Sequence, residues 1–379
     1  SYGLMIHSGG NVRLRAGVQY VLYNLIGSTL FLFALGSIYA ETGTLNMADL
    51  AQRVTLIDPA ESVGIRVASV LLLLVFAIKA ALVPLHFWLP SSYAEAPAPV
   101  AALFAIMTKV GAYAIIRVYT MIFPPELEVT MGLHGTWLLP LALISLGLGA
   151  LGVLAAGKLD RLVTFSVIGS MGMVMVTISL YTPESTAAAL YYMIHSTFAA
   201  AALFLIADIV RTSRGSLELT PMPVMAGAVT TSAMFFAAAI AMAGLPPLSG
   251  FLGKLLVLAA AFPTDAIVWV FAVVLISSLV NVVGFSRAGS ILFWKAKAVP
   301  ADEDAPEAEA PTNMSYMAVG GLLALLVLHT VFAGPVYRYM TATATQLYAP
   351  GPYISTVLDT PGKLSKPAGE DATKKEEDH

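Results

Sequence analysis

Residues 71–90 read LLLLVFAIKAALVPLHFWLP, and residues 241–262 read AMAGLPPLSGFLGKLLVLAAAF. Both stretches are apolar enough to lie in a membrane, yet each contains proline and one lysine. Proline removes a backbone hydrogen bond from a membrane helix, so the freed carbonyls must find other partners. The pattern therefore predicts two broken helices, over 64–89 and 226–262, and paired broken helices are typical of a transport site. A simple proline kink beside an incidental polar residue is the alternative for either segment alone.

The composition places the whole chain in a membrane. Its 379 residues are 58% hydrophobic and only 11% charged, with a mean hydropathy of +0.81, whereas soluble domains carry about 25% charged residues. The chain has no cysteine, which excludes disulfides, cysteine-ligated iron–sulfur clusters and thiolate zinc sites within it. Its basic residues form no stripe, so we expect no nucleic-acid partner. No metal or cofactor site is predicted.

Nine apolar segments predict an all-α integral membrane protein of about nine transmembrane helices. Besides the two broken helices, the segments are 17–40, 97–123, 137–157, 160–181, 186–210, 266–293 and 314–334. Small residues around Gly147–Gly157 indicate close helix packing. The expected division is a transmembrane domain over 1–294, an acidic loop over 295–313, a final helix over 314–334, and a tail over 335–379 with a disordered end.

The loops also predict an orientation. The two basic residues of one side are Arg53 and Arg66. The other side carries Arg13, Arg15, Lys158, Arg161, Arg211, Arg214, Arg287, Lys295 and Lys297. By the positive-inside rule this second side is cytoplasmic, and nine crossings then leave the tail outside.

Four ionisable residues lie inside the apolar stretches, namely Lys79, Lys109, His195 and Lys254. A lysine near the centre of a membrane helix costs about 2.5–3.5 kcal/mol on insertion scales, so we interpret the four as a path for protons or cations. Structural ion pairs or snorkelling are alternatives for the lysines, although Lys79 and Lys109 are expected near mid-helix. A packed core histidine is the alternative for His195.

Two further groups of polar residues receive weaker interpretations. His86 follows Lys79 by seven residues and would share its helix face if the helix continued past Pro84. It is a candidate for the water path beside Lys79. We expect packing or interface roles for His329, Asn281 and Asp208.

Proton movement requires groups whose charged and neutral forms differ little in free energy at working pH. An isolated lysine has a pKa near 10.4 and stays protonated, but desolvation lowers that value and a carboxylate neighbour raises it. A lysine that gains and loses a carboxylate partner therefore has a switchable proton affinity. Histidine suits the middle of such a relay because its ordinary pKa is near 6.5.

Four motifs resemble the antiporter-like family that multisubunit cation/proton antiporters share with the membrane arm of respiratory complex I. They are FAIKAALVPLHFWLPSSYAEAPAPVAALFAIMTKVGAY (76–113), KLDRLVTFSVIGSMG (158–172), YYMIHSTFAAAALFLIADI (191–209) and AGLPPLSGFLGKLLVL (243–258). The IHST and GFLGK variants most resemble the D-subunit branch of the Mrp (Pha, Mnh) antiporters.

The resemblance implies two inverted-topology repeats, each with one broken helix, and a hydrated line of charges along the middle of the membrane. Lys79 and Lys254 match the lysines of the broken helices, Lys109 the lysine of the helix after the first, and His195 the connecting histidine. The family pairs the lysine at the position of Lys79 with a glutamate on the preceding helix. That helix is expected upstream of Ser1, so we expect the chain to be an N-terminally truncated fragment.

Two functions remain open at this point. In both, we expect the chain to be a transporter subunit and not an enzyme. The first is a subunit of a Na⁺ or K⁺/H⁺ antiporter in a bacterial inner membrane, with other hydrophobic subunits, the two ions and lipid as partners. The second is a membrane-arm subunit of a complex I-like redox pump, in which quinone reduction elsewhere drives the same relay. A passive scaffold fits four buried ionisable residues poorly.

Overall fold

The computed structural model describes residues 2–7, 9–300 and 310–360. Over these residues the protein is helical throughout, and its one β-type feature is an isolated bridge between Lys158 and Glu218. The predicted all-α class is therefore confirmed. The acidic stretch 301–309 and the tail end 361–379 lie outside the described residues.

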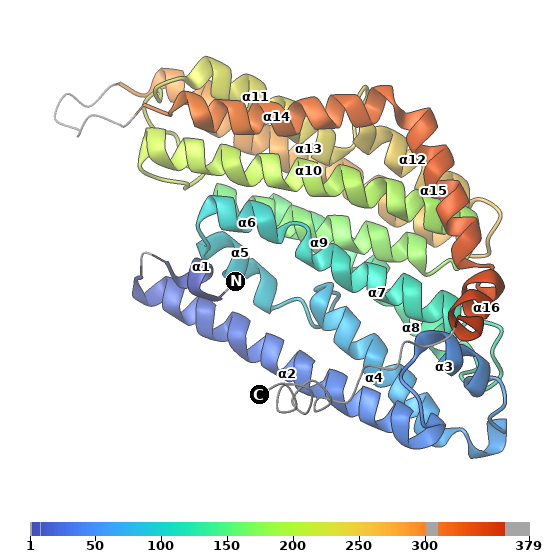
Figure 1. Ribbon diagram of the computed structural model, residues 1–379. Coiled ribbons are helices and arrows are strands. Elements are labelled where there is room, and N and C mark those ends of the chain that lie inside the picture. Colours follow the sequence, from blue (N-terminus) through green and yellow to red (C-terminus); the bar gives the residue numbers. More distant parts are fainter. Residues whose placement is uncertain (1, 8, 301–309, 361–379) are drawn as a thin grey trace, which may run out of the picture.

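Seven helical stretches of the described chain are long and apolar enough to cross a membrane. In Figure 1 the long helices lie side by side along one common direction. The stretches are α2 (Asn11–Thr42), α6 with α7 (Ala98–Phe104, Met107–Met121), α8 (Leu133–Ala155), α9 (Leu159–Ile178), α10 (Pro183–Arg214), α13 (Ile267–Gly289, continued by π and 3₁₀ turns to Ala298) and α14 (Asn313–Val331).

Two further crossings are made in two pieces, as the prolines predict. Helix α4 (Val63–Lys79) stops before Pro84 and the chain resumes as α5 (Trp88–Glu95). Helix α11 (Ala228–Ala243) likewise gives way to α12 (Ser249–Ala261). Each break contains a cis prolyl peptide bond, Val83–Pro84 in the first and Pro246–Pro247 in the second.

Helices α9 and α10 form the centre of the bundle. Residues of α9 are buried over 89% of its most apolar stretch, against 17% for α2 and for α14. Glycines allow α8 to approach α9 closely, because a Cβ on Gly149 would clash with the backbone nitrogen of Gly169. The predicted packing role is thus confirmed for Gly149 and Gly152 but not for Gly147, where a Cβ would meet nothing within 4 Å.

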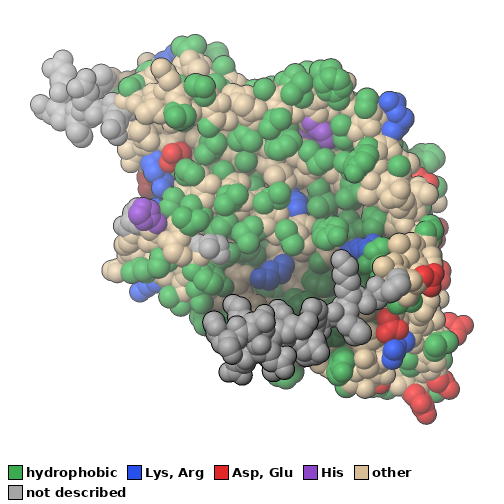
Figure 2. Space-filling model, in the orientation of Figure 1, with side chains coloured by type: hydrophobic (Ala, Val, Ile, Leu, Met, Phe, Trp, Pro, Cys, Tyr) green, Lys and Arg blue, Asp and Glu red, His purple; other side chains and the backbone are tan. Residues whose placement is uncertain are grey.

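On the face drawn in Figure 2, most charged side chains lie toward the two ends of the bundle, a few Lys or Arg side chains lie in the middle, and hydrophobic side chains cover much of the rest. At one end two arginines contact Glu95. Arg13 donates to its backbone carbonyl at 2.8 Å, and Arg161 pairs with its carboxylate at 3.3 Å. Arg211 pairs with Asp160 at 3.4 Å at the same end. The basic residues that the loops assign to one side therefore do lie together.

The structure contains short helices that the sequence analysis left as loop or tail. They are α3 (Met47–Val54), a 3₁₀ turn (Pro59–Glu61), α15 (Ala333–Leu347) and α16 (Gly351–Asp359), whereas the first helix, α1 (Tyr2–Ile6), precedes α2. Helix α15 packs along α10, and α16 packs against α3. The first part of the predicted tail is therefore helical and docked on the bundle.

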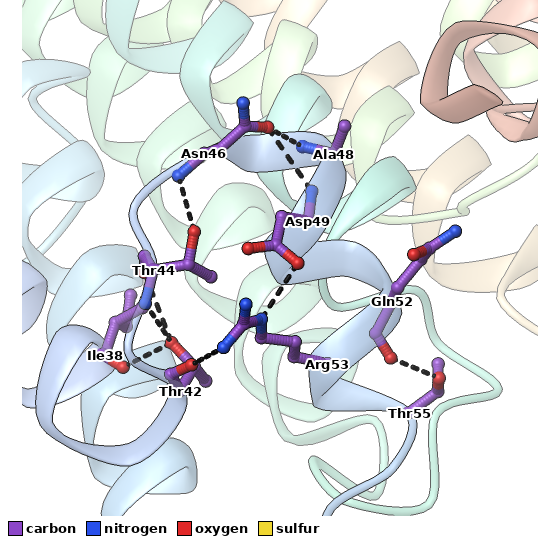
Figure 3. Close-up of polar contacts among 9 residues, drawn as sticks. All are labelled: Ile38, Thr42, Thr44, Asn46, Ala48, Asp49, Gln52, Arg53 and Thr55. Carbon is purple, nitrogen blue, oxygen red and sulfur yellow. Dashed lines mark hydrogen bonds and ion pairs between the residues drawn. The ribbon is translucent and has the colours of Figure 1, made fainter. Parts of the chain in front are cut away.

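Helix α3 is fixed by polar contacts at the end of α2 (Figure 3). The Asn46 side chain caps it by accepting from the backbone N–H groups of Ala48 and Asp49, at 2.9 and 3.3 Å. Arg53 binds Asp49 at 2.8 Å and donates to the carbonyl of Thr42 at 2.8 Å. The hydrogen bond from Arg53 holds the pKa of Asp49 below its ordinary value.

Candidate functional site

Lys79 is the last residue of α4 and lies directly at the first break. Its half-buried side chain reaches α2, where Nζ donates to Oδ1 of Asn24 at 2.5 Å. The expectation that Lys79 lies at mid-helix is wrong, because the helix ends there. A cation at the carboxyl end of a helix lies where the backbone carbonyls favour positive charge.

The backbone of the first break is held by groups from other helices. The N–H of Val83 donates to Oγ of Ser145 on α8 at 2.9 Å, and the indole of Trp88 donates to the Ile78 carbonyl at 3.0 Å. Gly111 on α7 touches the break, since a Cβ there would lie 2.7 Å from the Ala80 nitrogen. The break is therefore a defined structure rather than a loose joint.

His86 lies inside the first break, so the premise that it shares a helix face with Lys79 is wrong. The ring lies tilted against Phe87 with 4.5 Å between centroids, and its buried Nδ1 has no hydrogen-bond partner among the described residues. His86 still lies at the break that Lys79 borders. The non-helical backbone of the break places it there, and not a shared helix face.

Lys254 lies in the second turn of α12, directly after the second break. Its side chain is 7% exposed. Its Nζ donates to the carbonyl of Ala243, the last residue of α11, at 2.6 Å, and to Oγ of Ser278 on α13 at 2.7 Å. Gly244 allows this approach, because a Cβ there would lie 2.6 Å from the lysine side chain. The ammonium thus binds the free carbonyl end of a half-helix.

His195 on α10 is fully buried and contacts the same break. Its Nδ1 is 2.9 Å from Oγ of Ser249, the first residue of α12. Its Nε2 faces Gly250, where a Cβ would lie 2.8 Å from this nitrogen and would clash with the Ala241 carbonyl. The structure therefore brings His195 and Lys254 to one break, while Lys79 lies at the other.

Lys109 lies in the first turn of α7, where its side chain is 3% exposed. Its Nζ has no hydrogen-bond partner among the described residues. The residue borders a cavity of about 210 Å³ between α7 and α10 that Thr197 and Phe198 also line. A buried ammonium without partners is costly, so the position of Lys109 has a cost that no contact within the described chain offsets.

Sequence reasoning missed several residues of the site. Asn281, expected in packing, has a buried Oδ1 without a partner among the described residues and lines a cavity of about 10 Å³ beside Lys254. Ser166 and Ser170 of α9 line the same cavity, which is about the size of one water molecule. Polar residues in α9 and α13 were a visible signal, but nothing local indicated that they face Lys254.

The other two polar residues expected in packing fit that expectation. His329 stacks on Tyr191 of α10 with 4.2 Å between centroids, and its Nε2 lies 3.3 Å from the Tyr191 carbonyl. Asp208 lies with Asp160 and Arg211 near the basic end of the bundle.

The arrangement places titratable groups inside a membrane protein at two helix breaks and between them. Within the described chain, no group of three or more His, Asp or Glu side chains could hold a metal ion. Amines and imidazole exchange protons with water and with one another, so the arrangement is suited to moving protons.

The chain is similar to proteins of one family. Residues 1–280 match the family model described as "NADH:quinone oxidoreductase/Mrp antiporter, TM". The D subunit of a probable K⁺/H⁺ antiporter from Rhizobium meliloti is 33% identical, over 95% of this chain and 71% of that protein. The D subunit of a Na⁺/H⁺ antiporter from Bacillus subtilis is 36% identical, over 94% of this chain and 71% of that protein.

The fold has a similar counterpart among solved structures. A chain of the Mrp complex from Dietzia sp. DQ12-45-1b superposes with a TM-score of 0.82 at 25% identity. The match covers 94% of this chain and 73% of that one.

Proposed function

Because the chain belongs to the NADH:quinone oxidoreductase/Mrp antiporter transmembrane family, we propose that it is a membrane subunit of a multisubunit Na⁺ or K⁺/H⁺ antiporter. The relatives named as D subunits support this branch of the family, and they make the chain a transporter subunit rather than an enzyme. One of those relatives is named for K⁺ and the other for Na⁺, so the names do not choose the cation.

The observation that carries the proposal is the placement of one lysine at each helix break. Lys79 borders the first break and Lys254 binds the carbonyl end of the second. In the proposed mechanism Lys79 changes its proton affinity as its surroundings change, and Lys109, His195 and Lys254 pass the proton on. His86, in the first break, belongs to the water path beside Lys79.

The surroundings of the chain follow from its surface. Large apolar side chains such as Leu25, Leu32 and Phe33 of α2 are more than half exposed, which suits contact with lipid and with other hydrophobic subunits. We place the chain in a bacterial inner membrane, with the basic end cytoplasmic. Residues 1–294 form the proton-translocating domain in this proposal, followed by the acidic loop 295–313, the helix 314–334 and the tail from 335.

Replacing Lys79 by alanine tests the mechanism. Lys79→Ala should abolish cation-dependent proton movement in everted vesicles that contain the assembled complex, because it removes the amine that borders the first break. The measurement is the change in pH-dye fluorescence on adding Na⁺ or K⁺, at matched amounts of the chain in the membrane. Lys158→Ala, a lysine in a connection at the end of the bundle, is the control and should transport normally. Normal transport by Lys79→Ala would rule the mechanism out.

A redox-coupled pump is the second candidate, because the family description names NADH:quinone oxidoreductase together with the Mrp antiporter. The same lysines would then move protons in response to electron transfer in another subunit. The two candidates differ in their energy source and not in the residues of this chain.

A further inference from the structure

Both break lysines are held by a neutral side-chain oxygen from a neighbouring helix. Nζ of Lys79 lies 2.5 Å from Oδ1 of Asn24 on α2. Nζ of Lys254 lies 2.7 Å from Oγ of Ser278 on α13. One contact lies at each break, on the helix before the first break and on the helix after the second.

In both contacts the oxygen is free only to accept. The Asn24 amide group donates to the Tyr20 carbonyl at 2.8 Å, which turns Oδ1 toward Lys79. The Ser278 hydroxyl donates to the Val274 carbonyl at 2.6 Å, which leaves its lone pairs for Lys254. An ammonium has three donors and no acceptor, so these oxygens match the protonated lysine, and hydrogen bonds to a charged donor are stronger than neutral ones.

The position of Asn24 has little other explanation. It lies on a helix whose neighbouring side chains Leu22, Leu25 and Ile26 are exposed and apolar. An amide in such a helix is costly unless it bonds across to another helix. Gly27, one turn further, packs against Ile78, so the two helices are close where Asn24 meets Lys79.

No carboxylate competes for either lysine within the described chain. The ion pairs found there are Asp49–Arg53, Glu95–Arg161 and Asp160–Arg211. The one acidic residue on α2, α4, α7 and α8 together is Glu41, about 25 Å along α2 from Asn24. On the elements around Lys254 the acids are Asp160, Glu184, Asp208 and Asp265, all near helix ends or in a connection.

The other titratable groups near the two lysines are neutral or basic. Around Lys79 they are Tyr20 and Tyr23 on α2, His86 in the break, Lys109 on α7 and, further away, His134 on α8. Around Lys254 they are Tyr192 and His195 on α10 and, further away, His329 on α14. Among the described residues, the side-chain acceptors of the two lysines are therefore neutral oxygens.

We infer that Asn24 and Ser278 are positioning residues that hold the protonated forms of Lys79 and Lys254 at the two breaks and so set the pH range of proton movement. This inference rests on the proposed function. Each oxygen stabilises the ammonium over the neutral amine, and losing it makes the lysine release its proton more readily.

The test is the pH profile of cation-dependent proton movement in vesicles that contain the assembled complex. Asn24→Leu should move the pH of half-maximal transport toward acid by about one unit, as expected for one hydrogen bond to a charged group. Asn24→Asp should move it toward alkaline pH, because a carboxylate favours the ammonium more strongly. Ser278→Ala should give a smaller acid shift, because Lys254 keeps its bond to the Ala243 carbonyl.

Two controls separate this role from a structural one. Ser277 donates to the same Val274 carbonyl as Ser278, at 3.1 Å, and has no bond to the lysine. Thr29 on α2 bonds its own helix at Leu25. Ser277→Ala and Thr29→Val should leave the pH profile unchanged.

Opposite shifts for the two Asn24 variants, with unchanged controls, would support the inference. A loss of amplitude at an unchanged midpoint in both Asn24 variants would overturn it, as would equal shifts for Ser277→Ala and Ser278→Ala. The Lys79→Ala result separates a failure of the proposed function from a failure of this inference. If Lys79→Ala transports normally, the proposed function fails; if it is inactive while the Asn24 and Ser278 profiles are unchanged, only this inference fails.

Discussion

The two buried histidines near the carboxyl-terminal half of the bundle differ in what they bind. His195 contacts a side chain at the second break, Ser249, whereas His329 contacts the backbone of Tyr191 and stacks on its ring. Both are buried to a similar degree, at 0% and 6% exposure. Burial therefore does not distinguish them, but their partners do.

We expect glutamine at these two positions to have different effects. His195→Gln keeps a polar side chain but cannot take up a proton, so transport per assembled complex should fall by about tenfold or more. His329→Gln should leave transport per complex within about twofold and lower stability by about 1 kcal/mol, the value of a typical hydrogen bond. Vesicle transport and thermal unfolding of the purified complex measure the two effects. Equal losses of transport in the two variants would contradict the prediction that only His195 takes part in proton movement.

At this scale the sequence identified the ionisable residues but not their partners. Hydropathy is sufficient to find Lys79, Lys109, His195 and Lys254, because a charge inside an apolar run is conspicuous. The oxygens of Asn24 and Ser145 are 55 and 62 residues away from the groups they bind at the first break. No local pattern links residues so far apart, so only the packing of α2 and α8 against α4 could reveal them.

Among the elements, the first break depends on α7 fitting closely against it. The Cβ of an alanine at position 111 would lie 2.7 Å from the Ala80 nitrogen and 2.8 Å from the Phe76 carbonyl, which are backbone atoms that cannot turn aside. Helix α7 would have to move away from Lys79 and carry Lys109 with it.

Gly111→Ala should therefore lower stability by about 1–3 kcal/mol, as overpacking does, and should reduce transport as well. Gly147→Ala on α8 is the matched control, because a Cβ there meets nothing within 4 Å. Thermal unfolding of the detergent-purified complex and vesicle transport give the two readouts. A Gly111→Ala variant as stable and active as Gly147→Ala would show that the close contact is not needed.

The breaks were predictable from the sequence and the exact helix ends were not. Proline disfavours helix in the residue before it as well as at its own position. Helix α4 ends five residues before Pro84, so the helical spacing assumed between Lys79 and His86 does not apply. Helices α3, α15 and α16 were missed because they are short or lack a long apolar run. Tertiary contacts stabilise them, such as Arg117 stacking over Tyr353 of α16 at 4.5 Å.

At the scale of the whole molecule, the two broken helices run in opposite directions through one bundle. Helix α5 ends at Glu95, beside Arg13 and Arg161, so the first broken helix runs toward the basic end. The second begins after the segment that joins Lys158 and Glu218 at that end, so it runs away from it. His195 on the central helix α10 contacts the second break, so in the proposed mechanism protons move sideways through the bundle, from one break to the other.

The arrangement of the relay does not identify its energy source. An absorbance spectrum of the purified complex would identify it. A gradient-driven antiporter requires no redox centre, so we expect a colourless complex that exchanges Na⁺ or K⁺ for protons. A redox pump requires flavin or iron–sulfur centres in partner subunits, since this chain has no cysteine to bind a cluster. Stoichiometric flavin and iron–sulfur bands, bleached on adding NADH, would reverse our choice between the two functions. The complex should be purified through a tag on this chain, with Lys79→Ala prepared in parallel, because loss of the relay should stop transport without changing the spectrum.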